Sequence, residues 1–522
     1  MKKNSMLNIA ALFIGIFGVG MVLIFIIFIS KGYYHADCTD TITWAEAIID
    51  GNSLMNEEFY YACLLPFGGQ LLMLPFVAVF GVGMIAQICG MVLFALVFAA
   101  ALVFLCRSMD LSYKWSCVTL TSVLMVFSIS EKLREIFWCH IIYYSLGLLF
   151  LMVGLGLVLR IIKSENTKKR YYIFLCIWTV LCSMNGIQSL TIYGLPVVAA
   201  LIAEIFFDLK TPFICEKNYK KYILIFSLVI CVMTGFILSV FVNGNIVAGY
   251  QDGYSTFSDQ KAWMDNFLSL IPQLFTLFGV KVSSDVLIYS FDGILALLKI
   301  ICALVIITIP VIMTCMYKRF EEISYRLMIL THVFMTALIL LGWIFGSLNT
   351  ACWRLSPVVG TSVILCVMFM RRIYRNKSYR RISAIIAVPI MIMILLSVND
   401  IVKLDKQTEA NRQLQELAQL LEDNDLEYGY ATFWNANSIT LLSDSKVKVR
   451  CTRIDNGKIY PRMYQTNINW YKDNSYDKYF ILLTGNEYYE YLYGGSFVNP
   501  ERVITYEDFF ILVYSYNIME IK

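Results

Sequence analysis

The feature that most constrains the fold of this chain is a series of apolar stretches close to the length that crosses a lipid bilayer. A transmembrane helix needs roughly 20 consecutive, mostly apolar residues. Eleven stretches fit this pattern, although the third, fifth and tenth are short: 9–30, 84–106, 115–130, 140–161, 171–184, 188–207, 222–242, 293–316, 327–346, 356–370 and 382–398. We therefore predict a polytopic α-helical membrane protein with about 11 spans.

The composition agrees with this prediction. Charged residues make up only 15% of the 522-residue chain, and hydrophobic residues make up 59%. Soluble proteins carry about 25% charged residues, and so few charges cannot cover the outside of a soluble fold of this size. The composition therefore excludes a cytosolic enzyme, a disordered chain and a nucleic-acid-binding protein.

The distribution of Lys and Arg predicts the orientation. With the N-terminus inside, the inner segments carry 22 basic residues and the outer loops carry six. Such an excess is typical of cytoplasmic loops. An odd number of spans then places the C-terminus outside. We expect a multi-pass plasma-membrane protein with an extracytoplasmic C-terminal domain.

One further apolar segment, 64–81, is excluded from the span count. It contains Pro66, Pro75 and several glycines, which interrupt a membrane helix. A full span here would invert the sides of all later loops. We expect a juxtamembrane or re-entrant segment on the outer face.

The chain is predicted to consist of two parts. Residues 1–399 form the membrane domain, with long outer loops at 31–83 and 243–292. Residues 400–522 form a small outer α/β domain. In that domain the sequence pattern predicts a helix and four strands, at 407–421, 428–433, 447–450, 479–483 and 509–514.

The first outer loop carries the main catalytic candidates, Asp37 and Asp40. They follow the first span directly and are three residues apart, so they share a face if the segment is helical. A carboxylate at this place can act as a general base toward an acceptor hydroxyl, or can hold a divalent cation. The alternatives are two solvated loop acids, or an N-cap for a helix that begins near Thr41.

Three charged residues on the outer side are candidates for phosphate chemistry. Arg134 can bind a phosphate and Glu135 can serve as a second acid, unless the charges of this loop pair with one another at the interface. Arg354 is the only basic residue of its outer loop and can neutralise a departing phosphate. The alternative for Arg354 is interfacial snorkelling beside Trp353.

Three further polar residues are candidates for binding sugar or acceptor hydroxyls. They are His140, Asn185 and Gln188, which lie at the outer ends of predicted spans. A plain turn is the alternative for the segment of Asn185 and Gln188. The sequence contains no Walker A motif, no HExxH motif and no GxSxG motif in a strand–turn–helix context, which disfavours ATP-driven transport, zinc proteolysis and serine hydrolysis.

Taken together, these features resemble the GT-C fold of glycosyltransferases that use polyprenyl-phosphate sugars, such as the protein O-mannosyltransferase and aminoarabinose-transferase-like superfamily. The resemblance rests on an inner N-terminus, an outer acidic pair, a small-residue helix ending in Gly and a Pro/Gly-rich apolar stretch. The residues that carry it are Asp37, Asp40, Ala45–Gly51, Leu65–Gly69, Leu74, Pro75, Phe80 and Gly81. Trp353–Pro357 is similar to an Arg-Tyr-Leu-x-Pro element, but has Leu355 in place of the Tyr and one residue fewer before the Pro.

The resemblance implies transfer of a sugar from a polyprenyl-phosphate donor to an envelope glycan, lipid or protein, with inversion at the anomeric carbon. Asp37 or Asp40 would be the base, and Arg354 and Arg134 would stabilise the departing phosphate. The family's acids are often adjacent or in a DxD pattern, so the spacing here leaves the base unassigned. No cofactor is certain, and a divalent cation is possible.

Two other classes of function stay open. A transporter or flippase for lipid-linked saccharides would need charged residues within spans, for which Lys299 is the main basic candidate. A non-enzymatic envelope assembly protein would use the C-terminal domain to bind a partner.

Overall fold

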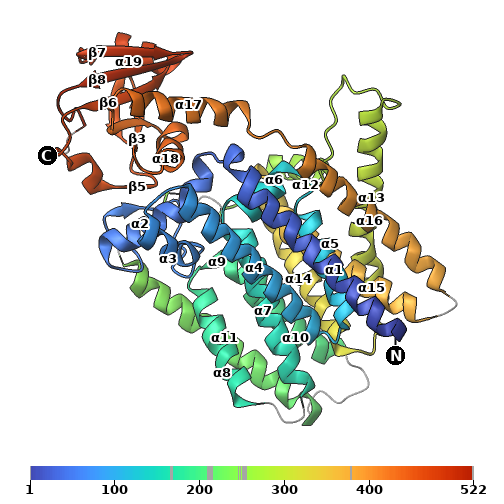
Figure 1. Ribbon diagram of the computed structural model, residues 1–522. Helices are drawn as coiled ribbons and strands as arrows, with labels where there is room; N and C mark the ends of the chain where they lie inside the picture. The colour runs from blue at the N-terminus through green and yellow to red at the C-terminus, as the bar shows by residue number, and fades with distance from the viewer. Residues whose placement is uncertain are drawn as a thin grey trace. The chain divides into compact units, whose positions relative to one another are not determined.

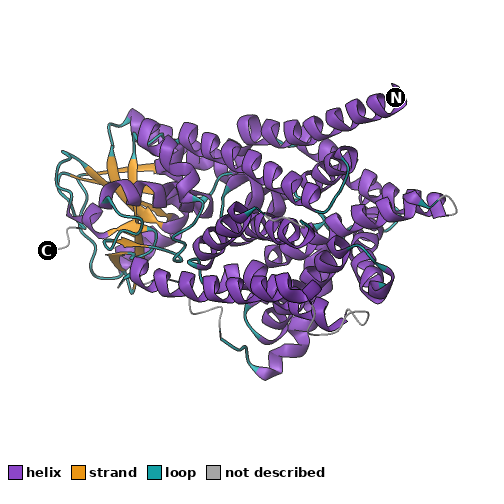
Figure 2. Ribbon diagram, turned by 90° about the horizontal axis from the view of Figure 1, so that it is seen from below, coloured by secondary structure: helices purple, strands orange, loops and turns teal. Residues whose placement is uncertain are grey.

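The computed structural model is mainly helical, with a small sheet near the C-terminus (Figures 1 and 2). It describes residues 2–164, 168–207, 216–244, 246, 248–249, 256–376 and 379–519, so part of the predicted loop 243–292 lies outside the described residues. The chain divides into two compact units. The first comprises Met1–Phe25, Ala95–Phe241 and Asp252–Leu404, and the second comprises Ile26–Phe94, Val242–Gln251 and Asp405–Lys522.

Nine helices in the described part of the chain are long and apolar enough to cross a membrane. They are Asn8–Tyr33, which continues α1 (Lys2–Ile24), α4 (Met84–Ser108), α7 (Tyr143–Lys163), Ile187–Phe207, which includes α10 (Leu195–Phe207), α11 (Glu216–Asn243), α13 (Phe291–Cys315), α14 (Ile323–Phe345), Cys352–Arg375, which includes α15 (Ser356–Arg375), and α16 (Arg380–Lys403). All nine coincide with predicted spans. The chain is therefore a multi-pass helical membrane protein.

The two remaining predicted spans are shorter helices. The first is α5 (Tyr113–Val126), which is followed by a bend of 114° into the helical segment Glu131–Cys139. Ser130 caps this new helix by accepting a hydrogen bond from Leu133 N at 3.3 Å. The second is α8 (Lys169–Ser183), with 15 residues. The total of 11 spans and the orientation thus stay predictions.

The Pro/Gly-rich segment contains a helix that is too short to cross a bilayer. This helix is α3 (Gln70–Phe80), with 11 residues and Pro75 inside it. It packs against α2 (Asp40–Gly51) within the second unit. The interpretation that this segment is not a full span therefore agrees with the structure.

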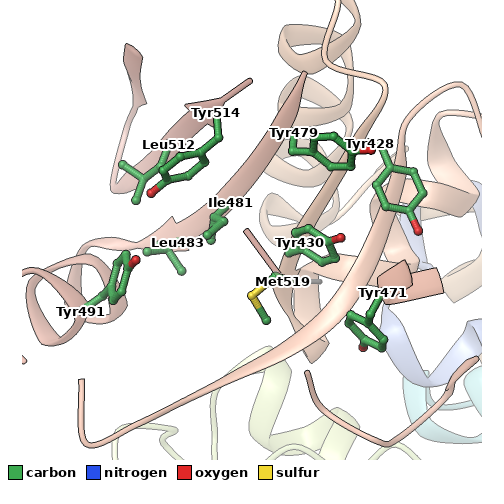
Figure 3. Packing of buried hydrophobic residues seen from close by; sticks show 10 residues of the cluster. All are labelled: Tyr428, Tyr430, Tyr471, Tyr479, Ile481, Leu483, Tyr491, Leu512, Tyr514 and Met519. Carbon is green, nitrogen blue, oxygen red and sulfur yellow. The ribbon is translucent and has the colours of Figure 1, made fainter. Parts of the chain in front are cut away.

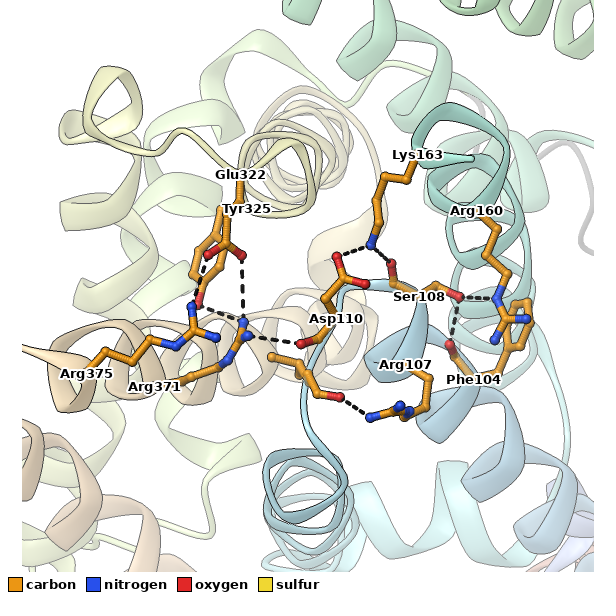
Figure 4. Close-up of polar contacts among 11 residues, drawn as sticks. Phe104, Arg107, Ser108, Asp110, Arg160, Lys163, Glu322, Tyr325, Arg371 and Arg375 are labelled. Atoms are coloured by element: carbon orange, nitrogen blue, oxygen red, sulfur yellow. Dashed lines mark hydrogen bonds and ion pairs between the residues drawn. The ribbon is translucent and has the colours of Figure 1, made fainter. Parts of the chain in front are cut away.

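In the first unit, polar contacts tie together helix ends that the sequence assigns to the inner side (Figure 4). Arg371 donates to the carbonyl of Asp110 at 2.9 Å, and Arg375 pairs with Glu322 at 3.1 Å. Lys163 donates to the carbonyl of Ser108 and pairs with the Asp110 carboxylate. These three basic residues therefore contact carboxylates or backbone carbonyls.

The sheet of the C-terminal domain has six strands in the order β4-β3-β2-β6-β8-β7. β2 is parallel to β3 and to β6, and the other pairs are antiparallel. The strands are β2 (Tyr428–Thr432), β3 (Lys448–Asp455), β4 (Lys458–Pro461), β6 (Tyr479–Thr484), β7 (Arg502–Tyr506) and β8 (Phe509–Tyr514). Helices α17 (Glu409–Asp423), α18 (Phe433–Leu442) and α19 (Gly485–Tyr493) accompany them.

The predicted helix and all four predicted strands of this domain are present, while the helices α18 and α19 and the strands β4 and β7 of the six-stranded sheet were missed. Both missed strands are edge strands with exposed or half-exposed residues, so their sequences lack a buried apolar run. Tyrosines dominate the core beneath the sheet (Figure 3). Their hydroxyl groups find partners: Tyr430 donates to Asn517 Oδ1 at 2.7 Å, and Tyr514 donates to Val498 O at 3.0 Å.

Within the second unit, the C-terminal domain is joined to the segment 31–83 by hydrogen bonds to backbone groups. Thr408 N donates to Gly32 O at 2.9 Å, and the Asn411 amide donates to the carbonyls of Lys31 and Tyr34 at 3.0 and 2.9 Å. The two-residue strand β1 (Phe59–Tyr60) pairs with β5 (Thr466–Asn467). The segment 31–83 was predicted to belong to the membrane domain, whereas here it shares one compact unit with the C-terminal domain.

Asp444 provides a test of the contact between the C-terminal domain and the N-terminal part of the second unit. Its Oδ1 accepts a hydrogen bond from Met84 N, the first residue of α4, at 2.7 Å. Removing such a helix cap costs about 1 kcal/mol, so we expect Asp444→Ala to lower the thermal stability of the detergent-solubilised protein. Asp477→Ala, which removes an exposed carboxylate of the same domain, is the control, and an equal loss in both variants would contradict the capping role.

Candidate active site

The two acids that follow the first span lie on consecutive helical turns. Asp37 belongs to the 3-10 turn Ala36–Thr39, and Asp40 is the first residue of α2. The side chain of Asp40 is buried, with 7% exposed, whereas Asp37 is partly exposed. The helix expected near Thr41 is present as α2. Because its side chain is buried, Asp40 is not a solvated loop acid.

The environment of Asp40 favours its neutral form. Burial raises the pKa of this carboxyl well above its ordinary value, and the negative charge of Asp37 raises it further. The nearby amide of Gln465 acts in the opposite direction and lowers the pKa. A buried acid with a raised pKa beside a second carboxylate is the usual setting of a general base or acid.

Gln465 is a residue of this site that the sequence analysis missed. Its Oε1 accepts a hydrogen bond from Trp44 Nε1 at 2.6 Å, one helical turn after Asp40. Its backbone N donates to Tyr60 O at 2.6 Å, and its carbonyl accepts from Asn437 at 3.2 Å. The sequence holds no signal for this contact, because Gln465 and Trp44 are 421 positions apart.

Farther along α2, Glu46 faces basic residues of the C-terminal domain. Burial raises the pKa of Glu46, while the charges of Arg450 and Lys448 lower it. Arg450 is buried on β3, and its guanidinium lies 3.6 Å from the centroid of the Trp470 ring. The acidic helix α2 and the basic strand β3 are therefore complementary in charge within the second unit.

In the first unit, Arg134 and Glu135 lie just after the sharp bend that follows α5. Both are buried, with 6% and 8% exposed. Arg134 donates to the carbonyl of Ser128 at 2.8 Å, and Glu135 pairs with Lys132 at 2.7 Å. Part of this charge cluster is thus mutually paired, which was the alternative interpretation from the sequence.

Arg354 lies in the 3-10 turn Cys352–Leu355 that precedes α15. Its side chain is buried, with 6% exposed, and donates to the carbonyl of Ser347 at 2.6 Å. The ammonium group of Lys132 lies 5.3 Å from the centroid of the neighbouring Trp353 ring. The fold therefore brings the segments of Arg134 and Arg354 together, and Lys132 adds a basic group that the sequence analysis did not select.

The three predicted hydroxyl-binding residues also lie in the first unit. His140 is buried where the helical segment Glu131–Cys139 ends, and Asn185 is buried in the turn after α8. Gln188 lies in the short helix Ile187–Ser189, and its Oε1 is buried without a hydrogen-bond partner among the described residues. Six of the eight candidates thus belong to the first unit, while Asp37 and Asp40 belong to the second.

The described residues contain no group of three or more His, Cys, Asp or Glu side chains that can hold a metal ion. Asp37 and Asp40 together supply only two carboxylates. Comparison with known protein families finds no matching family model, and comparison with curated proteins finds no significant match. The assignment of a function therefore rests on the residues themselves.

Proposed function

We propose that this protein is a membrane glycosyltransferase that moves a sugar from a polyprenyl-phosphate donor to an extracytoplasmic acceptor. The acceptor would be an envelope glycan, a lipid or a protein at the outer face of the plasma membrane. The observation that carries the proposal is Asp40, a buried carboxyl with a raised pKa that directly follows the first span and adjoins Asp37. The resemblance of the first outer loop to the GT-C fold supports the same function.

In this mechanism the ionised Asp40 accepts the proton of an acceptor hydroxyl, and Asp37 is the other candidate for this role. The acceptor oxygen forms a bond to the anomeric carbon while the bond from that carbon to the phosphate oxygen breaks on the opposite face. The configuration therefore inverts, and the lipid leaves as polyprenyl phosphate. General-base catalysis of this kind contributes about 10²–10⁴-fold to the rate.

The basic residues of the first unit are proposed to stabilise the departing phosphate. Arg354 and Arg134 are buried, and Lys132 lies beside the turn that carries Arg354. Positive groups placed where negative charge develops are often the largest single contribution to catalysis. Their hydrogen bonds to the backbone carbonyls of Ser347 and Ser128 fix the guanidinium groups in place.

Transport of lipid-linked saccharides is the second candidate, and buried charges in the first unit favour it. Glu204 on α10 is fully buried and pairs with Arg326 and Lys221. Lys299 on α13 pairs with Asp400 at 3.6 Å. Ionisable residues within membrane helices often mark a substrate or proton path.

Reconstitution separates the two functions. The purified protein would be placed in liposomes with polyprenyl-phosphate sugars and with acceptor glycans, lipids or peptides. Release of polyprenyl phosphate together with a new glycosidic product supports the transferase. Movement of the lipid-linked sugar across the bilayer without such a product would refute the transferase and support the transporter.

Arg354 gives a specific prediction within this assay. Arg354→Gln is expected to lower kcat/KM about 100-fold, which is the usual effect of removing one donor at a developing negative charge. Arg354→Lys should retain part of the activity, because the positive charge remains. Lys281→Gln, at an exposed basic residue between α12 (Trp263–Leu277) and α13, is the control, and equal kinetics of Arg354→Gln and wild type would remove Arg354 from the mechanism.

A further inference from the structure

Three helices of the first unit pack against one another, and their ends bring two basic residues to one junction. The helices are α5, α15 and α16, each of which contacts the other two. Lys114 lies in the first turn of α5, Tyr374 lies in the last turn of α15, and Arg380 is the first residue of α16. The distribution of basic residues in the sequence predicts that these helix ends face the cytoplasm.

The aromatic ring of Tyr374 is the centre of this junction. The Lys114 ammonium group lies 5.8 Å from the ring centroid, and the Arg380 guanidinium group lies 4.3 Å from it. Arg380 also donates a hydrogen bond to the Tyr374 hydroxyl. The indole ring of Trp115 meets the same ring edge-on, with 6.0 Å between the centroids. Because the face of an aromatic ring attracts cations, Tyr374 holds positive groups from two different helices at one place.

The neighbouring acids are engaged with other basic residues. Glu322 pairs with Arg375, and Asp110 pairs with Lys163 (Figure 4). The first turns of α5 and α16 contain no acidic residue. Within the described part of the chain, neither cation at the Tyr374 ring forms an ion pair with an acid. Like charges held together repel each other, so an anion bound beside both cations would stabilise the junction.

The junction is open at the surface of the unit. Tyr374 and Arg380 are exposed, and Lys114 is half-buried. After Arg380, one face of α16 presents exposed apolar side chains, which are Ile382, Ile385, Val388 and Leu395. Since α16 is long and apolar enough to cross a membrane, acyl chains are the natural surroundings of this face. A charged group that ends in apolar chains therefore complements both the junction and the helix beside it.

We propose that Lys114 and Arg380 bind the phosphodiester group of an anionic phospholipid of the cytoplasmic leaflet. The phosphate oxygens would accept hydrogen bonds from the ammonium and guanidinium groups, and the acyl chains would extend along the exposed face of α16. Tyr374 is a positioning residue, because it holds the two cations side by side. A zwitterionic lipid brings a positive group of its own, so the site should prefer phosphatidylglycerol to phosphatidylcholine.

This lipid site is separate from the proposed catalytic residues and does not rest on the proposed function. Arg354 lies just before α15, whereas Tyr374 lies in the last turn of that helix. At about 1.5 Å per residue, the 20 residues of α15 separate the two by about 30 Å. The bound phospholipid is therefore not the proposed sugar donor, and a transferase and a transporter would both retain it.

Native mass spectrometry of the full-length protein in detergent tests the site. Dioleoylphosphatidylglycerol and dioleoylphosphatidylcholine, which have the same acyl chains, would be titrated separately, and the fraction of protein with bound lipid measured. We expect phosphatidylglycerol to bind more tightly. The double variant Lys114→Gln with Arg380→Gln should weaken its binding about 30-fold, since each cation near an anionic headgroup contributes about fivefold. Binding of phosphatidylcholine should change much less.

Two control variants separate this site from the general positive charge of the surface. Lys114→Arg combined with Arg380→Lys keeps both charges and should retain most of the preference for phosphatidylglycerol. Lys318→Gln removes an exposed cation of the turn Tyr317–Arg319, on the same predicted side of the membrane, and should bind like wild type. Thermal unfolding without added lipid shows whether each variant is folded. If the double variant does not fold, Arg380→Gln alone replaces it, with an expected loss of about fivefold.

The proposal is overturned if wild type binds the two lipids equally, or if the charge-removing variants at the Tyr374 junction bind phosphatidylglycerol as tightly as wild type. It is also overturned if Lys318→Gln weakens binding as much as they do, since this would indicate diffuse attraction to the surface. A third arm adds inorganic phosphate at the half-saturating concentration of the lipid. Displacement of phosphatidylglycerol at that concentration would identify a site for free phosphate and refute the lipid site.

Discussion

Replacement of Asp40 by Asn is expected to lower sugar transfer by about 100-fold to 10,000-fold while the protein stays folded. The amide keeps the size and polarity of the side chain but cannot accept the proton of the acceptor, and a general base supplies about 10²–10⁴-fold. The rate of release of polyprenyl phosphate from liposomes measures the effect. Thermal unfolding in detergent shows that the fold is retained.

The pH dependence follows from the direction of the Asp40 shift. The base form exists only above the raised pKa, so activity should fall as the pH is lowered through a value above about 3.9, the ordinary value for Asp. A raised pKa in the folded state means that ionisation of Asp40 opposes folding. Its stabilising contribution is complete below the ordinary pKa and is lost as the pH rises through the raised value. The stability advantage of Asp40→Asn over wild type should therefore grow with pH.

Asp50→Asn is the matched control, since Asp50 lies on the same helix and is exposed. It should retain nearly full activity. Asp37→Asn should reduce transfer less than Asp40→Asn, and should shift the acid limb of the pH profile to lower pH because one negative neighbour is removed. A larger loss for Asp37→Asn than for Asp40→Asn would assign the base to Asp37 instead.

Replacement of Glu204 by Gln should destabilise the protein by about 3–5 kcal/mol, the usual effect of breaking a buried ion pair by removing one partner. Glu204 is fully buried, and its carboxylate lies 2.6 Å from Arg326 and 3.6 Å from Lys221. Tyr317 donates to it at 2.5 Å. Without the negative charge, the buried Lys221 and the partly exposed Arg326 would lose the counter-charge that they share. Thermal unfolding and the yield of monodisperse protein measure the loss.

Two further variants decide whether the charge balance is the cause. Glu321→Gln changes an exposed acid just before α14 and should have little effect on stability. The double variant Glu204→Met with Arg326→Met removes one charge of each sign and should recover part of the loss, because apolar side chains can replace a buried pair. Equal stability of Glu204→Gln and wild type would contradict the role of this cluster.

Local sequence patterns predicted much of the fold. Apolar runs located nine membrane helices, and the interruption by Pro66 and Pro75 identified a segment that is not a full span. Short segments rich in aromatic and β-branched residues located β2, β3, β6 and β8. Glu204 could also have been selected from the local sequence, because it is a single acid inside an otherwise apolar predicted span. Such an acid seldom lacks a function or a partner.

The candidate site was predicted only in part. The position of Asp37 and Asp40 after the first span singled them out, and Arg134 and Arg354 were selected as scarce outer charges. The sequence did not predict that Asp40 is buried, that Lys132 lies beside Trp353, or that Gln465 reaches α2. Each of these facts depends on segments that are far apart along the chain.

The sequence by itself thus determined that this is a membrane protein with about a dozen helical segments and a small α/β domain at its C-terminus. Hydrophobicity and periodicity are properties of neighbouring residues, so they can be recognised from the sequence without a structure. Only the tertiary structure joined the C-terminal domain to the segment 31–83, and this contact buries Asp40. The pKa of an acid and the partners of an amide depend on distance in space and on burial, which neighbours in sequence do not specify.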